Sequence, residues 1–216
     1  MAEMARHLGH EINNTLAAIV LRAEMLVMDV PVGAPARESV EVIDAAAQQG
    51  IALVARVREL ARLARPLARR PVDLSDAVDD ALEALRERLT ATPGVAVAYT
   101  RAALPPLLGD RAELALALRQ LVENALDSMP AGGRVRVETA VGNDSVRCRV
   151  VDGGDGVAPE ALARVFDPFS SSRGTHGRGL GLTIALTVAV RHGGDVQLEH
   201  APGGGTVATL RLPRPS

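Results

Sequence analysis

The sequence predicts an α+β protein in which an antiparallel helical hairpin, residues 1–66, is joined by a linker, 67–73, to an α/β sandwich, 74–216. Two observations support this prediction. Near the N-terminus, apolar residues recur every three or four positions in two long segments, which is the period of an amphipathic helix. Further along the chain, short apolar runs alternate with helical segments, as expected for helices packed on a mixed sheet.

The hairpin is predicted from helical segments at about 2–29 and 36–64, separated by Pro31, Gly33 and Pro35. Proline and glycine interrupt helices, so the chain should turn there. Each segment carries one apolar stripe, which in the first comprises Leu8, Ile12, Leu16, Ile19, Ala23 and Leu26. Two helices cannot enclose a core alone, so we expect two copies of the chain to pair as a dimeric four-helix bundle.

The second domain is expected to contain a helix at 74–89, capped by Asp73 or Ser75, a long helix at 110–129 and a third helix ending near residue 191. Strands are expected at 95–100, 134–140, 145–151, 196–199 and 206–212. Cys148 lies among valines in one of these strands, so we expect a buried thiol.

Composition excludes several classes of protein. The net charge of −2 gives no reason to expect nucleic acid or an anionic membrane as a partner. No apolar run approaches the roughly 20 residues that cross a bilayer, and residues 2–10 lack the apolar core of a signal peptide. Cys148 is the only cysteine, which excludes an intrachain disulfide and suits a cytoplasmic protein.

Five short motifs follow one another in a defined order. They are His10-Glu11-Ile12-Asn13-Asn14, Glu123-Asn124-Ala125, Asp152-Gly153-Gly154-Asp155-Gly156, Gly177-Arg178-Gly179-Leu180-Gly181-Leu182 and Gly203-Gly204-Gly205-Thr206. Each glycine motif alone is weak evidence. Together, over nearly the whole chain, they resemble the catalytic core of bacterial sensor histidine kinases: an H-box, then the N, G1, G2 and G3 boxes of the GHKL (Bergerat) ATPase fold shared with gyrase, MutL and a heat-shock chaperone.

The histidine motif falls on the first helix. A rotation of roughly 100° per residue places His10 off the apolar stripe, so its side chain should point outward. A neutral imidazole can attack phosphorus through one nitrogen while a carboxylate, here Glu11, engages the proton on the other. Alone, His10 would be an ordinary surface histidine, and a metal site with His7 lacks an obvious third ligand. The resemblance implies autophosphorylation of His10, transfer to an aspartate of a response-regulator receiver domain, and a phosphatase activity in which Asn14 orients water.

The resemblance also implies ATP and Mg²⁺ as cofactors. In the family, Asn124 supplies its side-chain oxygen to Mg²⁺, and Asp127 on the same helix belongs to the nucleotide site. Glu123 is a candidate metal-site residue, or it simply lies on the face of the helix. Gln120, one turn before Asn124, is an amide and cannot serve as a general base, which disfavours rapid ATP hydrolysis.

Asp152 ends an apolar strand, where a carboxylate is costly without a partner. The adenine amino group donates hydrogen bonds and guanine presents a carbonyl at that edge, so Asp152 should select ATP over GTP. Gly154 and Gly156 leave room for the backbone to pass close to the base. The alternative is a strand followed by a glycine turn.

The segment after this strand resembles a lid over the nucleotide. Phe166-Asp167-Pro168-Phe169 resembles the F-box, whose aromatics either anchor the lid or are core residues under a loop. Glycine-rich backbone leading into a helix presents free N–H groups to phosphate. The expected nucleotide contacts are Arg173, Gly177, Arg178, Gly179, Leu180, Gly181, Leu182 and Thr206. Arg173 stands where relatives often have Lys, so its contact with the γ-phosphate stays open. Residues 203–205 should support the base of the lid.

Three alternatives remain at this stage. One is a phosphotransfer scaffold without nucleotide binding, against which Asn124 and Asp152 argue. Another is a serine kinase of the anti-sigma type, which would lack the hairpin with the His-Glu-x-x-Asn motif. A DNA- or chaperone-type ATPase would need an acidic base in place of Gln120. The residues do not show whether the chain is the soluble core of a longer sensor protein.

Overall fold

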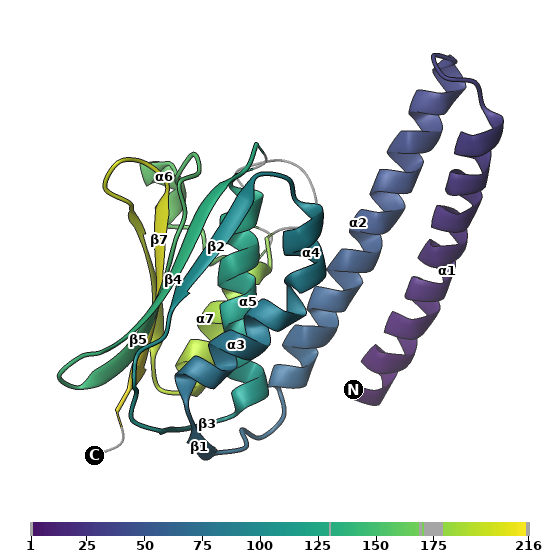
Figure 1. Cartoon of the computed structure of the whole chain (residues 1–216). Coiled ribbons are helices and arrows are strands. Elements are labelled where there is room, and N and C mark those ends of the chain that lie inside the picture. The colour runs from purple at the N-terminus through teal and green to yellow at the C-terminus, as the bar shows by residue number, and fades with distance from the viewer. Residues whose placement is uncertain (1, 130, 169, 171–178, 215–216) are drawn as a thin grey trace.

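The computed structural model describes residues 2–129, 131–168, 170 and 179–214, without the side chains of 2–10 and 159. Figure 1 shows a long helical hairpin lying beside a layered α/β domain. The hairpin consists of α1 (Ala2–Asp29) and α2 (Pro35–Leu63), close to the predicted ranges. The order of hairpin and sandwich is therefore as the sequence predicted.

The turn of the hairpin is held by Arg37 near the start of α2. Its Nη1 atom donates hydrogen bonds of 2.8 Å to the carbonyl oxygens of Val27 and Val30, at the end of α1. The apolar stripes are only partly covered within one chain, because Ile19 is 40% exposed and Ile43 is 52% exposed. The hairpin thus keeps an apolar face that a single chain does not bury.

The α/β domain is built on a five-stranded sheet in the order β2-β4-β5-β7-β6. β2 and β4 are parallel and the other neighbouring pairs are antiparallel, so the sheet is mixed, as predicted. The strands are β2 (Val95–Thr100), β4 (Gly133–Val141), β5 (Ser145–Val151), β6 (Asp195–His200) and β7 (Thr206–Pro213). The helices α3 (Leu74–Ala84), α5 (Arg111–Asp127) and α7 (Gly181–Arg191) cover one face of it (Figure 1).

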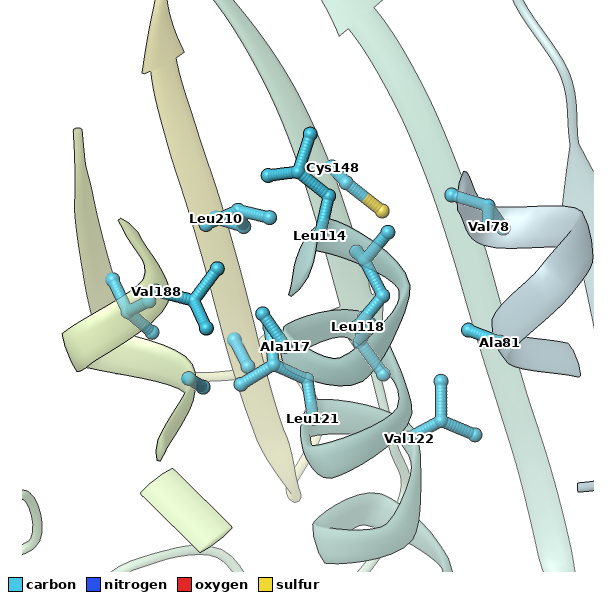
Figure 2. Close-up of a cluster of buried hydrophobic side chains, with 14 of the residues drawn as sticks. Val78, Ala81, Leu114, Ala117, Leu118, Leu121, Val122, Cys148, Val188 and Leu210 are labelled. Carbon is cyan, nitrogen blue, oxygen red and sulfur yellow. The ribbon is translucent and has the colours of Figure 1, made fainter. Parts of the chain in front are cut away.

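The core lies between this sheet and α5, and small aliphatic side chains fill it. Figure 2 shows Leu114 and Leu118 of α5 near Cys148 and Leu210 of the sheet, and all four are at most 1% exposed. Cys148 is fully buried, which confirms the buried strand cysteine expected from its valine neighbours, and this burial raises the pKa of its thiol to about 12. Each buried leucine contributes about 1.5–3 kcal/mol, so α5 is anchored firmly along its apolar side.

The structure differs from the sequence predictions in its short elements. The helix predicted at 74–89 is divided at Leu85, where α4 (Arg86–Ala91) begins. Asp73 caps α3, since its side chain accepts the N–H of Ser75 at 2.8 Å. The sequence did not predict α6 (Pro159–Leu162), or the small antiparallel sheet of β1 (Arg70–Val72) and β3 (Leu107–Gly109). β1 lies within the segment expected to be the linker.

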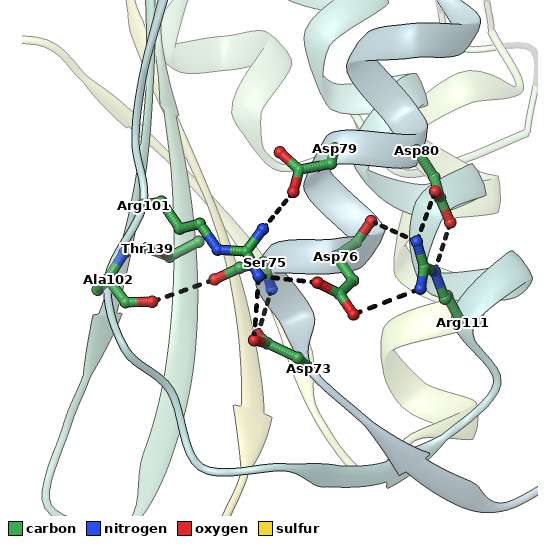
Figure 3. A network of polar contacts seen from close by, with 9 residues as sticks. All are labelled: Asp73, Ser75, Asp76, Asp79, Asp80, Arg101, Ala102, Arg111 and Thr139. Carbon is green, nitrogen blue, oxygen red and sulfur yellow. Dashed lines mark hydrogen bonds and ion pairs between the residues drawn. The ribbon is translucent and has the colours of Figure 1, made fainter.

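An ionic network fastens α3 to its neighbours (Figure 3). Arg111, the first residue of α5, forms hydrogen bonds of 2.6 and 2.7 Å with the two carboxylate oxygens of Asp80. These bonds lower the pKa of Asp80. Arg101, just after β2, contacts Asp73, Asp76 and Asp79. The acidic side chains of α3 are therefore paired with arginine, and being exposed they contribute little stability individually.

Candidate functional site

Asp152 follows β5 and is 5% exposed. Three donors converge on its Oδ1 atom: the Ser128 hydroxyl at 3.0 Å, the Gly154 N–H at 2.9 Å and the Thr206 N–H at 3.2 Å. Its own N–H donates to the carbonyl oxygen of Thr206 at 3.0 Å. This arrangement satisfies one carboxylate oxygen and fixes the direction of the other, which is the geometry needed to read a hydrogen-bond donor on a base.

The backbone around Asp152 is packed so closely that two positions require glycine. A Cβ atom on Gly154 would lie 2.6 Å from the carbonyl oxygen of Ser128. A Cβ atom on Gly205 would lie 2.8 Å from the carbonyl carbon of Asp152, and its φ of 88° is itself unfavourable for other residues. Of the G3-like glycines, Gly205 thus supports the floor of the site under Asp152, whereas a Cβ atom at Gly203 or Gly204 would meet nothing within 4 Å. Thr206 is 3% exposed and acts on Asp152 through its backbone.

The charged residues of the N-box lie on α5. Glu123 has a side chain only 14% exposed, with ion-pair distances of 3.5 Å to Arg119 and 3.8 Å to Arg56 of α2. Burial raises the pKa of its carboxyl group, although the arginines act to lower it. The Asp127 carboxylate pairs with Arg88 of α4. Both acids are therefore engaged by arginine, while Asn124 is half-buried between them.

Gln120, one turn before the N-box on α5, has its side chain next to the start of α7. It is 2% exposed, and its Oε1 atom has no hydrogen-bond partner among the described residues. A Cβ atom on Gly181, the first residue of α7, would lie 2.9 Å from that oxygen. Among the described residues, no side-chain hydrogen bond caps α7 at Leu180, and the N–H groups of a helix's first turn are suited to donate to a ligand. Leu180 and Leu182 are buried in the core, and only their backbone can reach a nucleotide.

The base of the predicted lid is held by Thr183 of α7. Its hydroxyl donates to the carbonyl oxygen of Phe166 at 2.9 Å, and Phe166 itself packs against the core. Gly179 is half-buried at the approach to the helix. Phe169 of the F-box-like segment and the predicted contacts Arg173, Gly177 and Arg178 lie outside the described residues.

The His10 motif lies on α1 of the hairpin. His10 lies within this helix. Its side chain is not among those that the structure describes, so the outward direction stays a prediction. Glu11 and Asn14 are exposed, one residue and one turn after it. The sequence prediction missed Ser128 and Thr183 as supports of the site, because no local pattern links Ser128 to Asp152, 24 residues away.

The described residues fit Mg²⁺ bound mainly through a nucleotide. Among them, no group of three or more His, Cys, Asp or Glu side chains could hold a metal ion. The amide oxygen of Asn124 is a hard donor of the kind Mg²⁺ accepts, and this ion usually keeps waters and substrate phosphates as its other ligands. Asn124 would therefore hold the ion together with waters and phosphate oxygens.

The comparisons with known proteins agree with this geometry. The model of histidine kinase-, DNA gyrase B- and HSP90-like ATPases matches residues 109–216, and that of the His Kinase A phospho-acceptor domain matches residues 1–66. Together the fold and the two matches define an ATPase-type domain preceded by a phosphoacceptor-type hairpin. The chain belongs to the sensor histidine kinase family.

Similar proteins span nearly all of this chain. The sensor-like histidine kinase SenX3 of Mycobacterium tuberculosis is 31% identical over 220 residues, covering 98% of this chain and 53% of that protein. The histidine-protein kinase/phosphatase MprB of Mycolicibacterium paratuberculosis is 30% identical, covering 98% and 43%. The crystal structure of full-length ShkA in complex with AMPPNP is 28% identical with a TM-score of 0.71, covering 99% and 46%. The chain thus spans about half the length of these relatives. No helix in the described part of the chain is long and apolar enough to cross a membrane.

Proposed function

We propose that this chain is the autokinase core of a two-component system, which transfers the γ-phosphoryl group of Mg-ATP to His10 and then to an aspartate of a response-regulator receiver domain. The observation that carries the proposal is the buried, triply hydrogen-bonded Asp152 in the same chain as a helical hairpin with the His10 motif. The names of the relatives and the AMPPNP in the ShkA crystal support it.

Adenine recognition follows from the geometry of Asp152. Because three donors occupy Oδ1, the second carboxylate oxygen is left to accept a hydrogen bond from the adenine amino group. Guanine carries a carbonyl oxygen at that edge, which would face the carboxylate and repel it. The site should therefore prefer ATP to GTP.

The phosphates would lie between α5 and the start of α7. The N–H groups of the first turn of α7, beginning at Gly181, would donate to them. Asn124 would hold Mg²⁺, which when bound neutralises charge on the phosphate oxygens. Gln120 lines the same region without a group able to deprotonate water, so bound ATP would be spared hydrolysis.

The transfer of the γ-phosphoryl group to His10 needs no reactant besides ATP and the imidazole. A ring nitrogen of neutral His10 forms a bond to the γ-phosphorus, the bond from that phosphorus to the β–γ bridging oxygen breaks, and ADP leaves. Glu11 engages the proton on the other ring nitrogen. In the second step the receiver aspartate attacks phosphorus and the P–N bond breaks. As in other phosphoryl transfers, catalysis rests on positioning and charge neutralisation.

A phosphatase activity is the second function that we propose. Asn14 is exposed one turn after His10, where its amide can orient a water molecule toward an aspartyl phosphate on a docked receiver domain. The name of MprB, a kinase/phosphatase, supports this assignment. We also assign the core to the cytoplasm, where ATP and receiver domains are available.

We propose a homodimer through the exposed face of the hairpin, since the His Kinase A domain implies dimerisation. Ile43 is 52% exposed in one chain and would be covered in a four-helix bundle. Ile43→Glu should convert the dimer to a folded monomer in analytical ultracentrifugation. Glu38→Gln, also on α2, is the control, and a dimer that persists in Ile43→Glu would refute the assigned face.

Autophosphorylation is tested with γ-labelled ATP and Mg²⁺, comparing the chain with His10→Gln and with His7→Gln as a matched control on the same helix. We expect label that is lost in acid, survives alkali, is absent from His10→Gln and is kept in His7→Gln. Label that persists in acid and in both variants would indicate a serine kinase instead. ATP binding without label would reduce the chain to a phosphatase or an inactive scaffold.

A further inference from the structure

The end of α2 and the segment after it carry a basic repeat. Residues 60–72 contain four arginines and no acidic residue. Three of these arginines end a Leu-Ala-Arg triplet, and the triplets are Leu60-Ala61-Arg62, Leu63-Ala64-Arg65 and Leu67-Ala68-Arg69. The fourth is Arg70. We call Arg62, Arg65, Arg69 and Arg70 the arginine strip.

The leucines of the repeat face the protein, whereas the arginines face water. Leu63 is 4% exposed within the core, and Leu60 packs against that core. Leu67 is half-buried, and all four arginines of the strip are exposed. The repeat therefore uses its apolar residues to attach the segment and leaves its charges on the surface.

The backbone of the strip is fixed at two further points. The carbonyl oxygen of Arg65 accepts a hydrogen bond of 2.9 Å from Arg191 of α7. Arg70 begins β1 and lies opposite Gly109 in the small antiparallel sheet. A ligand of the arginines would therefore meet a chain segment that is already ordered, which lowers the entropy cost of binding.

The guanidinium groups of the strip have no protein partner. None of them forms an ion pair or a hydrogen bond with a residue in the described part of the chain. Arg62 and Arg65 border a cavity of about 600 Å³ whose acidic residues are engaged elsewhere. Glu59 pairs with Arg119, Asp80 with Arg111 and Glu113 with Arg191, while Asp110 caps α5. The strip is therefore available to an external anion.

The strip lies at one end of the molecule. Figure 1 shows the C-terminal end of α2 and the N-terminal end of α1 at the same end, opposite the turn of the hairpin. In a dimer whose two-fold axis runs along the helices, both strips lie at this end of the four-helix bundle. A flat anionic surface could then engage both strips at once, which strengthens binding without any new contact.

We propose that the arginine strip binds the phosphate groups of an anionic phospholipid bilayer, so that this end of the protein rests on a membrane surface. A guanidinium group pairs with phosphate through two parallel hydrogen bonds. Clusters of four to eight basic residues are typical of binding to anionic lipids. The net charge of −2 conceals this cluster, so the expectation drawn from net charge is revised. The inference goes beyond the proposed autokinase function and does not depend on it.

Nucleic acid fits the strip less well than a bilayer. Proteins hold single strands with aromatic side chains that stack on the bases. Tyr99 and Phe166, the aromatic residues in the part of the chain that the structure describes, instead pack against the core. Duplex DNA is read by a helix or a β-ribbon in its major groove. Three arginines of the strip lie beyond the end of α2, where no helix presents them to a groove.

The test removes two charges from the strip. Arg65→Gln/Arg69→Gln leaves the backbone hydrogen bond of Arg65 in place, and urea unfolding checks that the variant is as stable as the original chain. The matched control is Arg134→Gln/Arg136→Gln on β4, where both side chains are exposed and also lack an ion pair with any described residue. None of these four side chains belongs to the proposed catalytic site.

The readout is co-sedimentation with vesicles of phosphatidylcholine alone, or with about 30% phosphatidylglycerol added. The original chain should bind only the anionic vesicles and should be released at about 0.5 M salt, because salt screens the attraction. Each arginine near an anionic surface changes the affinity about fivefold, so Arg65→Gln/Arg69→Gln should bind at least about tenfold more weakly. The control variant should bind like the original chain.

Four results would overturn the proposal. They are no binding of the original chain to anionic vesicles, equal binding to phosphatidylcholine alone, an equal loss in both double variants, and release by inorganic phosphate at constant ionic strength. Binding of a labelled oligonucleotide that depends on the strip, without binding to vesicles, would replace the membrane with nucleic acid. The assay contains no ATP, so absence of label on His10 would refute the autokinase function and leave the membrane result intact.

Discussion

Gly205 offers a direct test of how one glycine of the G3-like motif supports the site. The perturbation is Gly205→Ala, and its matched control is Gly203→Ala in the same turn. Both positions have a positive φ, 88° at Gly205 and 96° at Gly203. They differ in their surroundings, because a Cβ atom at Gly203 meets nothing within 4 Å, whereas one at Gly205 lies 2.8 Å from the carbonyl carbon of Asp152 and closer still to its oxygen.

The magnitudes follow from this difference. Each alanine substitution lowers the free energy of unfolding by about 1–3 kcal/mol because of the unfavourable φ. Gly205→Ala lowers it by about 1–3 kcal/mol more, because the backbone of Asp152 must move to make room for the methyl group. That movement also disturbs the hydrogen bond from the Thr206 N–H to the Asp152 carboxylate. Only Gly205→Ala should therefore weaken nucleotide binding as well as stability.

Urea unfolding of both variants measures the two free energies, and calorimetric titration with a non-hydrolysable ATP analogue measures binding. We expect Gly205→Ala to be the less stable variant by at least about 1 kcal/mol. It should also bind the analogue more weakly, with Gly203→Ala close to the original chain. Equal stability of the two variants, or unaltered binding by Gly205→Ala, would refute the role of Gly205 as a support for Asp152.

Three further predictions concern single side chains. In Asp152→Asn the three converging donors hold the amide oxygen in the Oδ1 position and turn the NH₂ group toward the base. Two donor groups then face each other, so affinity for the ATP analogue should fall about tenfold or more. Unchanged affinity in calorimetry would contradict this. Thr183→Val removes the 2.9 Å hydrogen bond to Phe166 and should cost about 1 kcal/mol in urea unfolding, whereas Thr183→Ser should keep most of it. The Cys148 thiol, with its pKa raised to about 12 by burial, should react with a disulfide reagent at pH 8 only after unfolding; fast reaction of the folded chain would show that the core opens readily.

The sequence alone predicts the elements whose signal is local. The two helices of the hairpin follow from apolar spacing, and the five strands of the main sheet follow from short apolar runs with turn residues between them. Candidate site residues that belong to a motif, such as Asn124 and Asp152, are predicted in the same way, because a motif places the residue types that the chemistry needs close together in the sequence.

The short elements and the supports of the site carry no such signal. The break of the helix at Leu85 and the pairing of β1 with β3 depend on contacts with the rest of the domain, and three-residue strands show too little periodicity to be read.

What the sequence by itself determined is the order of hairpin and sandwich, and it also predicted which groups would do the chemistry. Only the tertiary structure decided how these groups are held. Ser128 and Thr206 reach Asp152 from 24 and 54 residues away, and Arg119 meets Glu59 across 60 residues. The physical reason is that periodicity records which face of an element is buried, whereas the partner on the other side is chosen by the packing of the whole chain.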